Sequence, residues 1–338
     1  MVSIGVVGCG HWGPNHIRIF SQVSGAKVSM CSDLDEARLQ AVSASFPDIQ
    51  TTKDYKRILG NPAIDAVCIA TPTATHYHLV KEALQAGKHV LCEKPLSLQA
   101  SECLELKSLA DHQGKILAVG HIFLFNEGIR KLKEYIQSGE LGNIYYAHSE
   151  RTNLGPFRYD VNALWDLAPH DLSIFNYLFD GAATSVSARG QKCLNTPLDD
   201  LAFATLEYPH NVLVNIHVSW LDPRKVRQIT IVGDKKMVVW DDLDNLGPIK
   251  LYDKHVEKTQ VFYQTYGDFQ LLSKEGSITI PKVSAREPLR TQNQYFIDCI
   301  NKKMSAGLID AQKAFDIVRT LEAIQRSMDS GGHPMKVE

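Results

Sequence analysis

The chain has 338 residues, of which 44% are hydrophobic and 22% are charged, and its formal net charge is −2. This length favours two domains, and the near-neutral charge offers no attraction for nucleic acid or an anionic membrane surface. The N-terminus lacks the basic start of a signal peptide, and no apolar run approaches the roughly 18 residues of a membrane span. The seven cysteines are odd in number and scattered, so we expect a reducing, cytoplasmic setting.

The first 121 residues alternate between short apolar runs and helical stretches. The run 66–70, AVCIA, is apolar throughout, as expected for a strand that is buried on both faces. Strands are predicted at 3–7, 27–31, 50–51, 66–70, 89–92 and 116–119. Helices are predicted at 14–24, 36–45, 55–59, 76–86 and 99–113. This order predicts an α/β fold whose N-terminal domain, residues 1–121, is a Rossmann domain with a doubly wound parallel sheet.

The pattern changes in residues 122–338, which we assign to a second domain. Helices are predicted at 126–138, 164–178, 288–301 and 310–328. Strands are predicted at 144–152, 185–190, 202–208, 212–221, 226–232, 237–240 and 249–252. Apolar and polar residues alternate from Val214 on, which is typical of a strand with one face buried and the other open. We therefore expect an α+β domain built on a large, mostly antiparallel open sheet.

The first strand is followed by Gly8-Cys9-Gly10-His11-Trp12-Gly13, a GxGxxG pattern that opens the first helix. Alone this pattern is weak, because glycines are common in turns. Between a strand and a helix, the glycines permit a tight turn and let the backbone approach a pyrophosphate at the helix N-terminus. The motif therefore predicts a dinucleotide site.

Asp33 ends the second strand, about 20 residues after the glycine motif, where an acidic residue holds the ribose hydroxyls of NAD. A helix N-cap is the alternative role for this residue. No arginine lies beside it to accept a 2′-phosphate, although Arg38 follows one helical turn later. The sequence therefore favours NAD without excluding NADP.

Polar groups also follow the fourth, fifth and sixth strands: Thr71-Pro72-Thr73, Glu93-Lys94-Pro95 and Gly120-His121. Ligands of open parallel sheets bind outside the carboxyl ends of the strands, so these groups and the glycine motif share one edge. We expect Lys94 to reach the nicotinamide crevice, with Glu93 to orient it and a cis bond before Pro95 to fix its direction. An ordinary surface pair of Glu93 and Lys94 is the alternative.

A second group of polar residues is WDLAPHD at 165–171, in which Asp166 and His170 share one face of a helix. Histidine titrates near neutral pH and suits proton transfer from an alcohol, although a buried structural histidine is also common. No third ligand completes a zinc site, and the seven cysteines form no CxxC pair, so we expect no metal. Lys94 alone also suits Schiff-base chemistry, but a neighbouring dinucleotide site favours hydride transfer.

Three motifs together resemble the Gfo/Idh/MocA oxidoreductase family, in the family's order: GCGHWG at 8–13, CEKPLS at 92–97 and WDLAPHDLS at 165–173. The resemblance covers essentially the whole chain. It implies that Lys94 is the active-site lysine, that His170 transfers the proton, and that Asp166 supports them at the substrate. The resemblance further implies a cofactor lining of Thr71, Pro72, Thr73, His76 and Glu93. It also implies a homodimer or homotetramer formed through the open sheet.

Within the family, GHWGPN, the stretch 150–174 and Phe125-Asn126 look most like the nucleotide-sugar 3-dehydrogenases. That subgroup oxidises the 3-hydroxyl of a UDP-N-acetylhexosamine, and the resemblance would place Asn126, Arg151, Asn153 and Arg158 near the substrate. Ordinary polar loop and strand residues are the alternative for the last three. Oxidation of a free sugar or inositol, and a non-catalytic NAD(H)-sensing regulator, remain the other interpretations of the whole chain.

Overall fold

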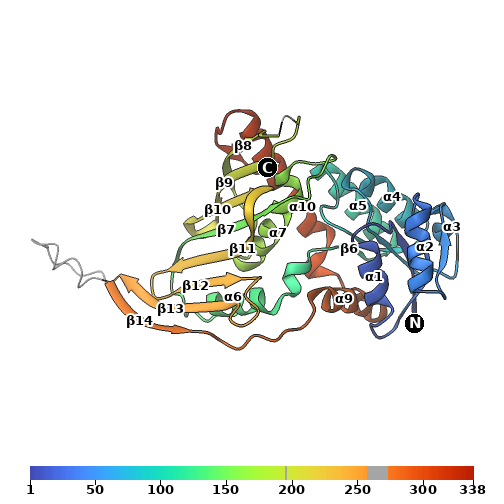
Figure 1. The fold of residues 1–338 in the computed structure, drawn as a ribbon, viewed down its shortest axis with the longest axis horizontal. Helices are drawn as coiled ribbons and strands as arrows, with labels where there is room; N and C mark the ends of the chain where they lie inside the picture. The colour runs from blue at the N-terminus through green and yellow to red at the C-terminus, as the bar shows by residue number, and fades with distance from the viewer. Residues whose placement is uncertain (195, 257–272) are drawn as a thin grey trace, which may run out of the picture. The chain divides into compact units, whose positions relative to one another are not determined.

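The computed structural model describes residues 1–194, 196–256 and 273–338 (Figure 1). These residues form two compact units. The first comprises Met1–Phe125 and Arg286–Glu322, and the second comprises Asn126–Ala285 and Ala323–Glu338. A single division after residue 121 differs from this arrangement, because residues 286–322 pack with the N-terminal unit.

The N-terminal unit is built on a six-stranded sheet in the order β3-β2-β1-β4-β5-β6, with every neighbouring pair parallel. The strands are β1 (Val2–Val7), β2 (Ala26–Ser32), β3 (Gln50–Thr52), β4 (Ala66–Ile69), β5 (His89–Cys92) and β6 (Leu117–Val119). β4 is buried at all four residues, which agrees with its unbroken apolar sequence. The strand order and the parallel pairing confirm the predicted Rossmann sheet.

Helices cover this sheet and connect its strands (Figure 1). The helices are α1 (Gly13–Phe20), α2 (Glu36–Ser45), α3 (Lys56–Leu59), α4 (His76–Gln85), α5 (Ala100–Gln113) and α9 (Pro288–Lys302). A further helix, α10 (Ala311–Asp329), begins in this unit and continues into the second. The short 3₁₀ turns are η1 (Thr73–Thr75), η2 (Ile122–Phe125) and η4 (Gly307–Ile309). α1 packs beside α9, and α4 packs beside α5. The contact with α9 explains why a segment from the end of the chain belongs to the first unit.

The second unit is built on a nine-stranded sheet in the order β14-β13-β12-β11-β7-β10-β9-β8-β15. The strands are β7 (Ile144–Leu154), β8 (Ser185–Gln191), β9 (Leu201–Tyr208), β10 (Val212–Ser219), β11 (Leu221–Gly233), β12 (Met237–Asp241), β13 (Ile249–Val256), β14 (Ser273–Thr279) and β15 (Met335–Lys336). Among the strands that the structure describes, only β7 and β10 pair in parallel, so the predicted antiparallel character is confirmed.

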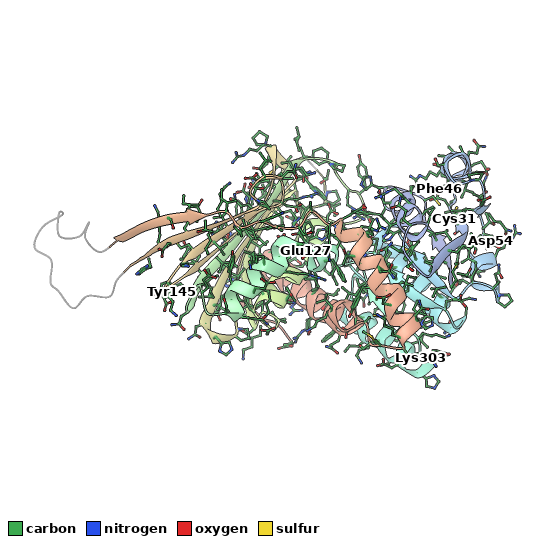
Figure 2. The ribbon with its side chains drawn as sticks, turned by 90° about the horizontal axis from the view of Figure 1, so that it is seen from below. Cys31, Phe46, Asp54, Glu127, Tyr145 and Lys303 are labelled. Atoms are coloured by element: carbon green, nitrogen blue, oxygen red, sulfur yellow. The ribbon has the colours of Figure 1, made fainter. Side chains whose placement is uncertain are left out.

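One face of this sheet is covered by helix. α7 (Ala163–Leu178) packs on β7, β9 and β10, α6 (Glu127–Gln137) packs on α7 and β12, and η3 (Pro209–Asn211) joins β9 to β10. Inward residues such as Val214 and Ile216 are buried, whereas Leu213 and Asn215, which alternate with them, are exposed. This alternation is the one predicted from Val214 on. Figure 2 shows the side chains, with Tyr145 labelled at the start of β7.

Several boundaries differ from the sequence-based expectation. α1 ends at Phe20 rather than 24, where serines and Gly25, with φ of 81°, replace good helix formers. β11 runs unbroken from Leu221, through a bulge that precedes Val226. β14 and β15 were not predicted, because neither has an alternating apolar pattern. Within the described ranges, no helix combines the length and apolar character that crossing a membrane requires.

Candidate active site

The glycine motif forms the turn between β1 and α1. Gly8 has φ of 93°, and a Cβ at this position would lie 2.6 Å from the carbonyl oxygen of Ala70. A Cβ at Gly13 would lie 2.0 Å from the carbonyl oxygen of Gly8. Gly10 differs, because its Cβ would meet only a guanidinium nitrogen of Arg38, at 3.7 Å. The outer glycines thus make the turn, and the middle one leaves its backbone open to a close ligand.

The N-terminus of α1 suits an anion. Its N-cap, Trp12, supplies no side-chain hydrogen bond to the first amides, and no acidic residue lies in the first turn. The unsatisfied N–H groups and the helix dipole together favour a negative charge at this point. His11 is exposed and contacts Trp12 edge to face, with ring centroids 5.6 Å apart. The loop therefore has the features of a pyrophosphate site.

Asp33 lies directly after β2 and is tied to the glycine loop. Its Oδ2 accepts a hydrogen bond from the amide of Cys9 at 2.7 Å, and its Oδ1 accepts one from the amide of Asp35 at 2.9 Å. Asp35, not Asp33, caps α2 by accepting a bond from the amide of Ala37. The cap role considered for Asp33 therefore belongs to Asp35, and the ribose contact expected of Asp33 remains a prediction.

The turn after β4 is stabilised by its own side chains. The hydroxyl of Thr75 lies 2.7 Å from both the hydroxyl of Thr71 and the carbonyl oxygen of Pro72, and Thr73 is buried. His76 is also buried, and its ring nitrogens contact the carbonyl oxygens of Thr71 at 2.9 Å and Pro95 at 2.7 Å. Both nitrogens are thus engaged by backbone. His76 therefore joins two turns of this edge, and its expected contact with the cofactor remains a prediction.

Glu93 follows β5 and pairs with His16, a residue that no sequence pattern marks as part of the site. Its Oε1 lies 2.9 Å from Nε2 of His16, with exposed fractions of 11% and 1% for the two side chains. Its Oε2 accepts a hydrogen bond from the amide of Lys94 at 3.3 Å. Glu93 is therefore part of a buried pair and not of an ordinary surface pair. The Lys94–Pro95 bond is cis, as predicted.

The environment of this pair changes both pKa values. Burial lowers the pKa of His16, but the neighbouring Cys68 and the Glu93 carboxylate outweigh burial and raise it to about 10. Burial raises the pKa of Glu93, but the hydrogen bond and charge of His16, together with Lys94, lower it overall. Nδ1 of His16 lies 3.2 Å from the side-chain amide of Asn293, which can present either an oxygen or a nitrogen. Glu93 is thus held as a carboxylate beside Lys94.

His121, which follows β6, is another buried histidine at this edge. It is 1% exposed, and neither ring nitrogen has a hydrogen-bond partner among the described residues. Burial lowers its pKa to about 4, with Lys94 lowering it further and Glu93 opposing the shift. The sequence placed Gly120-His121 at the correct strand end, but it gave no sign of this burial.

In the second unit, Asp166 and His170 lie one turn apart on α7. Oδ1 of Asp166 accepts a hydrogen bond from Arg158 at 3.1 Å, and its Oδ2 accepts one from the indole of Trp220 at 3.2 Å. The backbone carbonyl of His170 accepts a bond from the hydroxyl of Ser173 at 2.7 Å. Asp166 is therefore fixed by two donors, and Arg158 is engaged by a carboxylate of its own unit.

Two other residues expected at the substrate make structural contacts in the same unit. The side-chain oxygen of Asn126 caps α6, and its side-chain nitrogen donates a hydrogen bond to Asp242 at 3.2 Å. The amide of Asn153 donates to the carbonyl oxygen of Gly155. Their expected substrate contacts remain predictions, and the capping role of Asn126 stands independently of any ligand.

Arg151 is buried in β7 and forms a bidentate pair with Asp171 of α7. Nε lies 2.8 Å from Oδ2, and Nη2 lies 3.0 Å from Oδ1, with both side chains at most 4% exposed. The pair thus anchors the helix that carries His170 to the sheet beneath it. No group of three or more His, Cys, Asp or Glu side chains in the described residues has the arrangement of a metal site.

Both parts of the chain match known sequence profiles. Residues 2–121 match the profile described as an oxidoreductase family with an NAD-binding Rossmann fold. Residues 129–239 match the GFO/IDH/MocA C-terminal domain. The two matches agree with the parallel sheet of the first unit and the antiparallel sheet of the second.

Individual relatives point the same way. The chain is 30% identical over 202 residues to the oxidoreductase YrbE of Bacillus subtilis (strain 168), and the match covers 58% of this chain and 59% of YrbE. It is 31% identical over 228 residues to inositol 2-dehydrogenase 2 of Paenarthrobacter aurescens (strain TC1), covering 64% of this chain and 68% of that relative. The chain thus spans about three fifths of YrbE and about two thirds of the inositol dehydrogenase.

The solved structure of UDP-N-acetylglucosamine 3-dehydrogenase GnnA from Acidithiobacillus ferrooxidans is similar over nearly the whole length. Its TM-score is 0.81 at 22% identity, with 97% of each chain covered. At this identity the likeness shows a shared fold. The profile matches and the 31% identity to a dehydrogenase show that this chain belongs to the Gfo/Idh/MocA oxidoreductase family, with an NAD-binding Rossmann domain in residues 2–121.

Proposed function

We propose that the protein oxidises a ring hydroxyl of a sugar or cyclitol to a ketone, with NAD⁺ as the hydride acceptor. The observation that carries this proposal is the arrangement of the turns after β1, β2, β4 and β5. These neighbouring strands bring the glycine loop, Asp33, Thr71 and Lys94 to one edge of the sheet. In sheets of this order, a dinucleotide lies across the edge where the strand order reverses, here between β1 and β4.

The residues of this edge fit a bound dinucleotide. The open backbone at Gly10 and the uncapped start of α1 would receive the pyrophosphate, and Asp33 would hold the ribose. A 2′-phosphate would approach the carboxylate of Asp33, which lies 3.6 Å from its nearest cation, Arg38. Like-charge repulsion therefore favours NAD⁺ over NADP⁺ as the cofactor.

In the proposed reaction, His170 accepts the proton of the substrate hydroxyl. Lys94 donates a hydrogen bond to the same oxygen and stabilises the negative charge that develops there. Asp166, fixed by Arg158 and Trp220, keeps its carboxylate on the same face of α7 as His170. The carbon-bound hydrogen leaves as a hydride to NAD⁺, so one proton and one hydride are removed together.

The finer identity of the substrate has two candidates. The motif resemblance favours the 3-hydroxyl of a UDP-N-acetylhexosamine, and the GnnA structure has the same fold. The 31% identity to an inositol 2-dehydrogenase favours a cyclitol. The two arginines expected near sugar or phosphate, Arg151 and Arg158, both form ion pairs with carboxylates. Those ion pairs weaken the argument for a nucleotide-sugar phosphate at these two residues.

The test is reduction of NAD⁺ followed by absorbance, with UDP-N-acetylglucosamine, its uronic acid, free sugars and myo-inositol as substrates. Turnover with UDP-sugars alone supports the first candidate, and turnover with free polyols alone supports the second. NAD⁺ binding without turnover of any of these substrates would contradict the enzymatic proposal and favour an NAD(H)-sensing protein.

Lys94→Ala and His170→Ala are each expected to lower kcat by about 10²- to 10⁴-fold, because each removes a group that acts on the reacting oxygen. The dissociation constant for NAD⁺, measured by calorimetry, should change little. Lys53→Ala and His78→Ala, at exposed positions of the first unit, serve as controls for removing a lysine and a histidine. Unchanged kcat in either active-site variant would reject that residue's role.

A further inference from the structure

His121 is a buried histidine whose ring nitrogens lack partners among the described residues. Buried polar groups in folded proteins almost always make hydrogen bonds, and an unsatisfied donor or acceptor is destabilising. A buried imidazole with two unsatisfied nitrogens therefore indicates that something outside the chain completes its hydrogen bonds. The other buried histidines of this unit illustrate the contrast, because His16 and His76 each have contacts at both ring nitrogens.

The backbone places His121 beside the active-site lysine. β5 and β6 pair in parallel with Cys92 opposite Val119, so Gly120 and His121 extend alongside Glu93 and Lys94. The amide of Gly120 donates to the carbonyl oxygen of Cys92 at 2.8 Å. Thus His121 leaves its strand at the same level of the sheet as Lys94.

Because Gly120 has no side chain, the backbone after β6 can lie close to the carboxylate of Glu93. A Cβ at Gly120 would lie 3.2 Å from Oε1 and 3.3 Å from Oε2 of Glu93. Any larger residue would push against the carboxylate that pairs with His16. Glu93 and Lys94, which follow β5, are therefore packed against Gly120 and His121, which follow β6.

The hydrogen-bonding capacity of His121 follows from its protonation. Burial and the nearby Lys94 lower its pKa to about 4, although Glu93 opposes the change. At neutral pH the ring carries one N–H donor and one nitrogen acceptor. It is too weak a base to be the proton acceptor of the reaction, but it can bind a group that offers both an acceptor and a donor.

We infer that His121 is a ligand-binding residue of the active site, which hydrogen-bonds a neutral group carrying both a donor and an acceptor. Two groups at a dehydrogenase site have this chemistry: a hydroxyl of the substrate and the carboxamide of the nicotinamide. The inference rests on the proposed function, because it takes Lys94 as the residue that marks the reacting centre. It adds a specificity-determining contact that the three family motifs do not contain.

The experiment compares His121→Phe, which keeps a planar ring and removes both nitrogens, with His121→Gln, which restores one donor and one acceptor. For the carboxamide, dissociation constants are measured by calorimetry for NAD⁺ and for its 3-acetylpyridine analogue, which lacks the amide N–H. For the hydroxyl, kcat/KM is measured with the active substrate and with its deoxy analogues. The thermal midpoint of each variant monitors folding.

His121→Phe is expected to lower either the affinity for NAD⁺ or kcat/KM by about tenfold. His121→Gln is expected to restore at least part of that loss. Weaker NAD⁺ binding with lost discrimination against the acetylpyridine analogue assigns the carboxamide. Lower kcat/KM with lost discrimination against one deoxy analogue assigns the hydroxyl.

If His121→Phe keeps the wild-type NAD⁺ affinity and the wild-type kcat/KM, the inference is overturned, because the ring nitrogens then bind neither cofactor nor substrate. Equal losses in the phenylalanine and glutamine variants would overturn it too, because they would indicate a structural role. The proposed function is judged separately by Lys94→Ala. If that variant is inactive while His121→Phe is normal, only the inference about His121 fails.

Discussion

Glu93 is the residue that connects Lys94 to the body of the first unit. It accepts a hydrogen bond from His16 on α1 and contacts the amide of Lys94. Since His16 is 1% exposed, its charge is stabilised by Cys68 and by this carboxylate and not by water. The backbone that presents Lys94 is therefore fixed by an ion pair, in addition to the bridge that His76 makes to Pro95.

This ion pair predicts a specific pH dependence of stability. The pKa of His16 rises from 6.5 to about 10 on folding, so its stabilisation is complete below pH 6.5 and is lost as the pH rises toward 10. The pKa of Glu93 falls below its ordinary 4.5, so its stabilisation is present above that pH and is lost on acidification. The ion pair therefore stabilises the folded state most between pH 4.5 and pH 6.5.

His16→Gln is expected to lower stability by about 3 to 5 kcal/mol in that window, because it leaves a buried carboxylate without its cation. Thermal midpoints of the wild type and the variant, measured across pH, should converge as the pH approaches 10. The exposed His78→Gln serves as a control with no such dependence. A difference between wild type and His16→Gln that stays constant with pH would contradict a charged pair.

At the scale of elements, the sequence predicted the strand ends well because each is marked locally. Apolar runs stop at glycine, threonine-proline or glutamate-lysine, and those residues lie at the expected edge. The partners of the site residues were not predictable in this way. His16 is 77 residues from Glu93, and Asn293 is 277 residues from His16, so these contacts depend on how α1 and α9 pack.

The same limit applies to the second unit. The spacing of Asp166 and His170 predicted their shared helix face, but Arg151 reads as an available cation in the sequence. Only the pairing of β7 with α7 shows that a carboxylate occupies it. Side-chain partners across elements are set by packing, whereas the periodicity of a sequence reports each element alone.

The pair of Arg151 and Asp171 leads to a prediction about α7. Asp171→Asn leaves the guanidinium buried without its counter-ion, which should cost about 3 to 5 kcal/mol. This loss corresponds to a fall in thermal midpoint on the order of 10 °C for a unit of this size. The matched control is Asp160→Asn, which breaks a more exposed pair with Arg158 in the same unit.

The measurement separates a structural role from substrate binding. If Arg151 supports α7, Asp171→Asn lowers the thermal midpoint and reduces kcat through His170, with little change in substrate KM at a temperature where the protein is folded. A large rise in KM with an unchanged midpoint would instead support the substrate contact that the sequence suggested for Arg151.

At the scale of the whole molecule, the nine-stranded sheet has one face that no helix of the described residues covers. Its open face carries Phe203, Leu213 and Tyr146, which are 48%, 47% and 45% exposed. Leu213 lies opposite Tyr146, and Phe203 lies opposite His217 with ring centroids 4.2 Å apart. Neighbouring apolar groups on an exposed sheet face are typical of a surface that binds another protein.

We expect this face to join two copies of the chain, so the wild type should have the mass of a dimer or tetramer in light scattering. Phe203→Glu places a charge on the exposed face of β9, and burying it in an interface without a partner is unfavourable. The variant should therefore shift toward the monomer with its thermal unfolding otherwise cooperative. Leu246→Glu adds the same charge at a residue that is 97% exposed outside these strands, and it should keep the wild-type mass. A monomeric wild type would show that the open face does not join two copies. A Phe203→Glu variant of unchanged mass would show the same, because the charge can remain in water only if no second copy covers it.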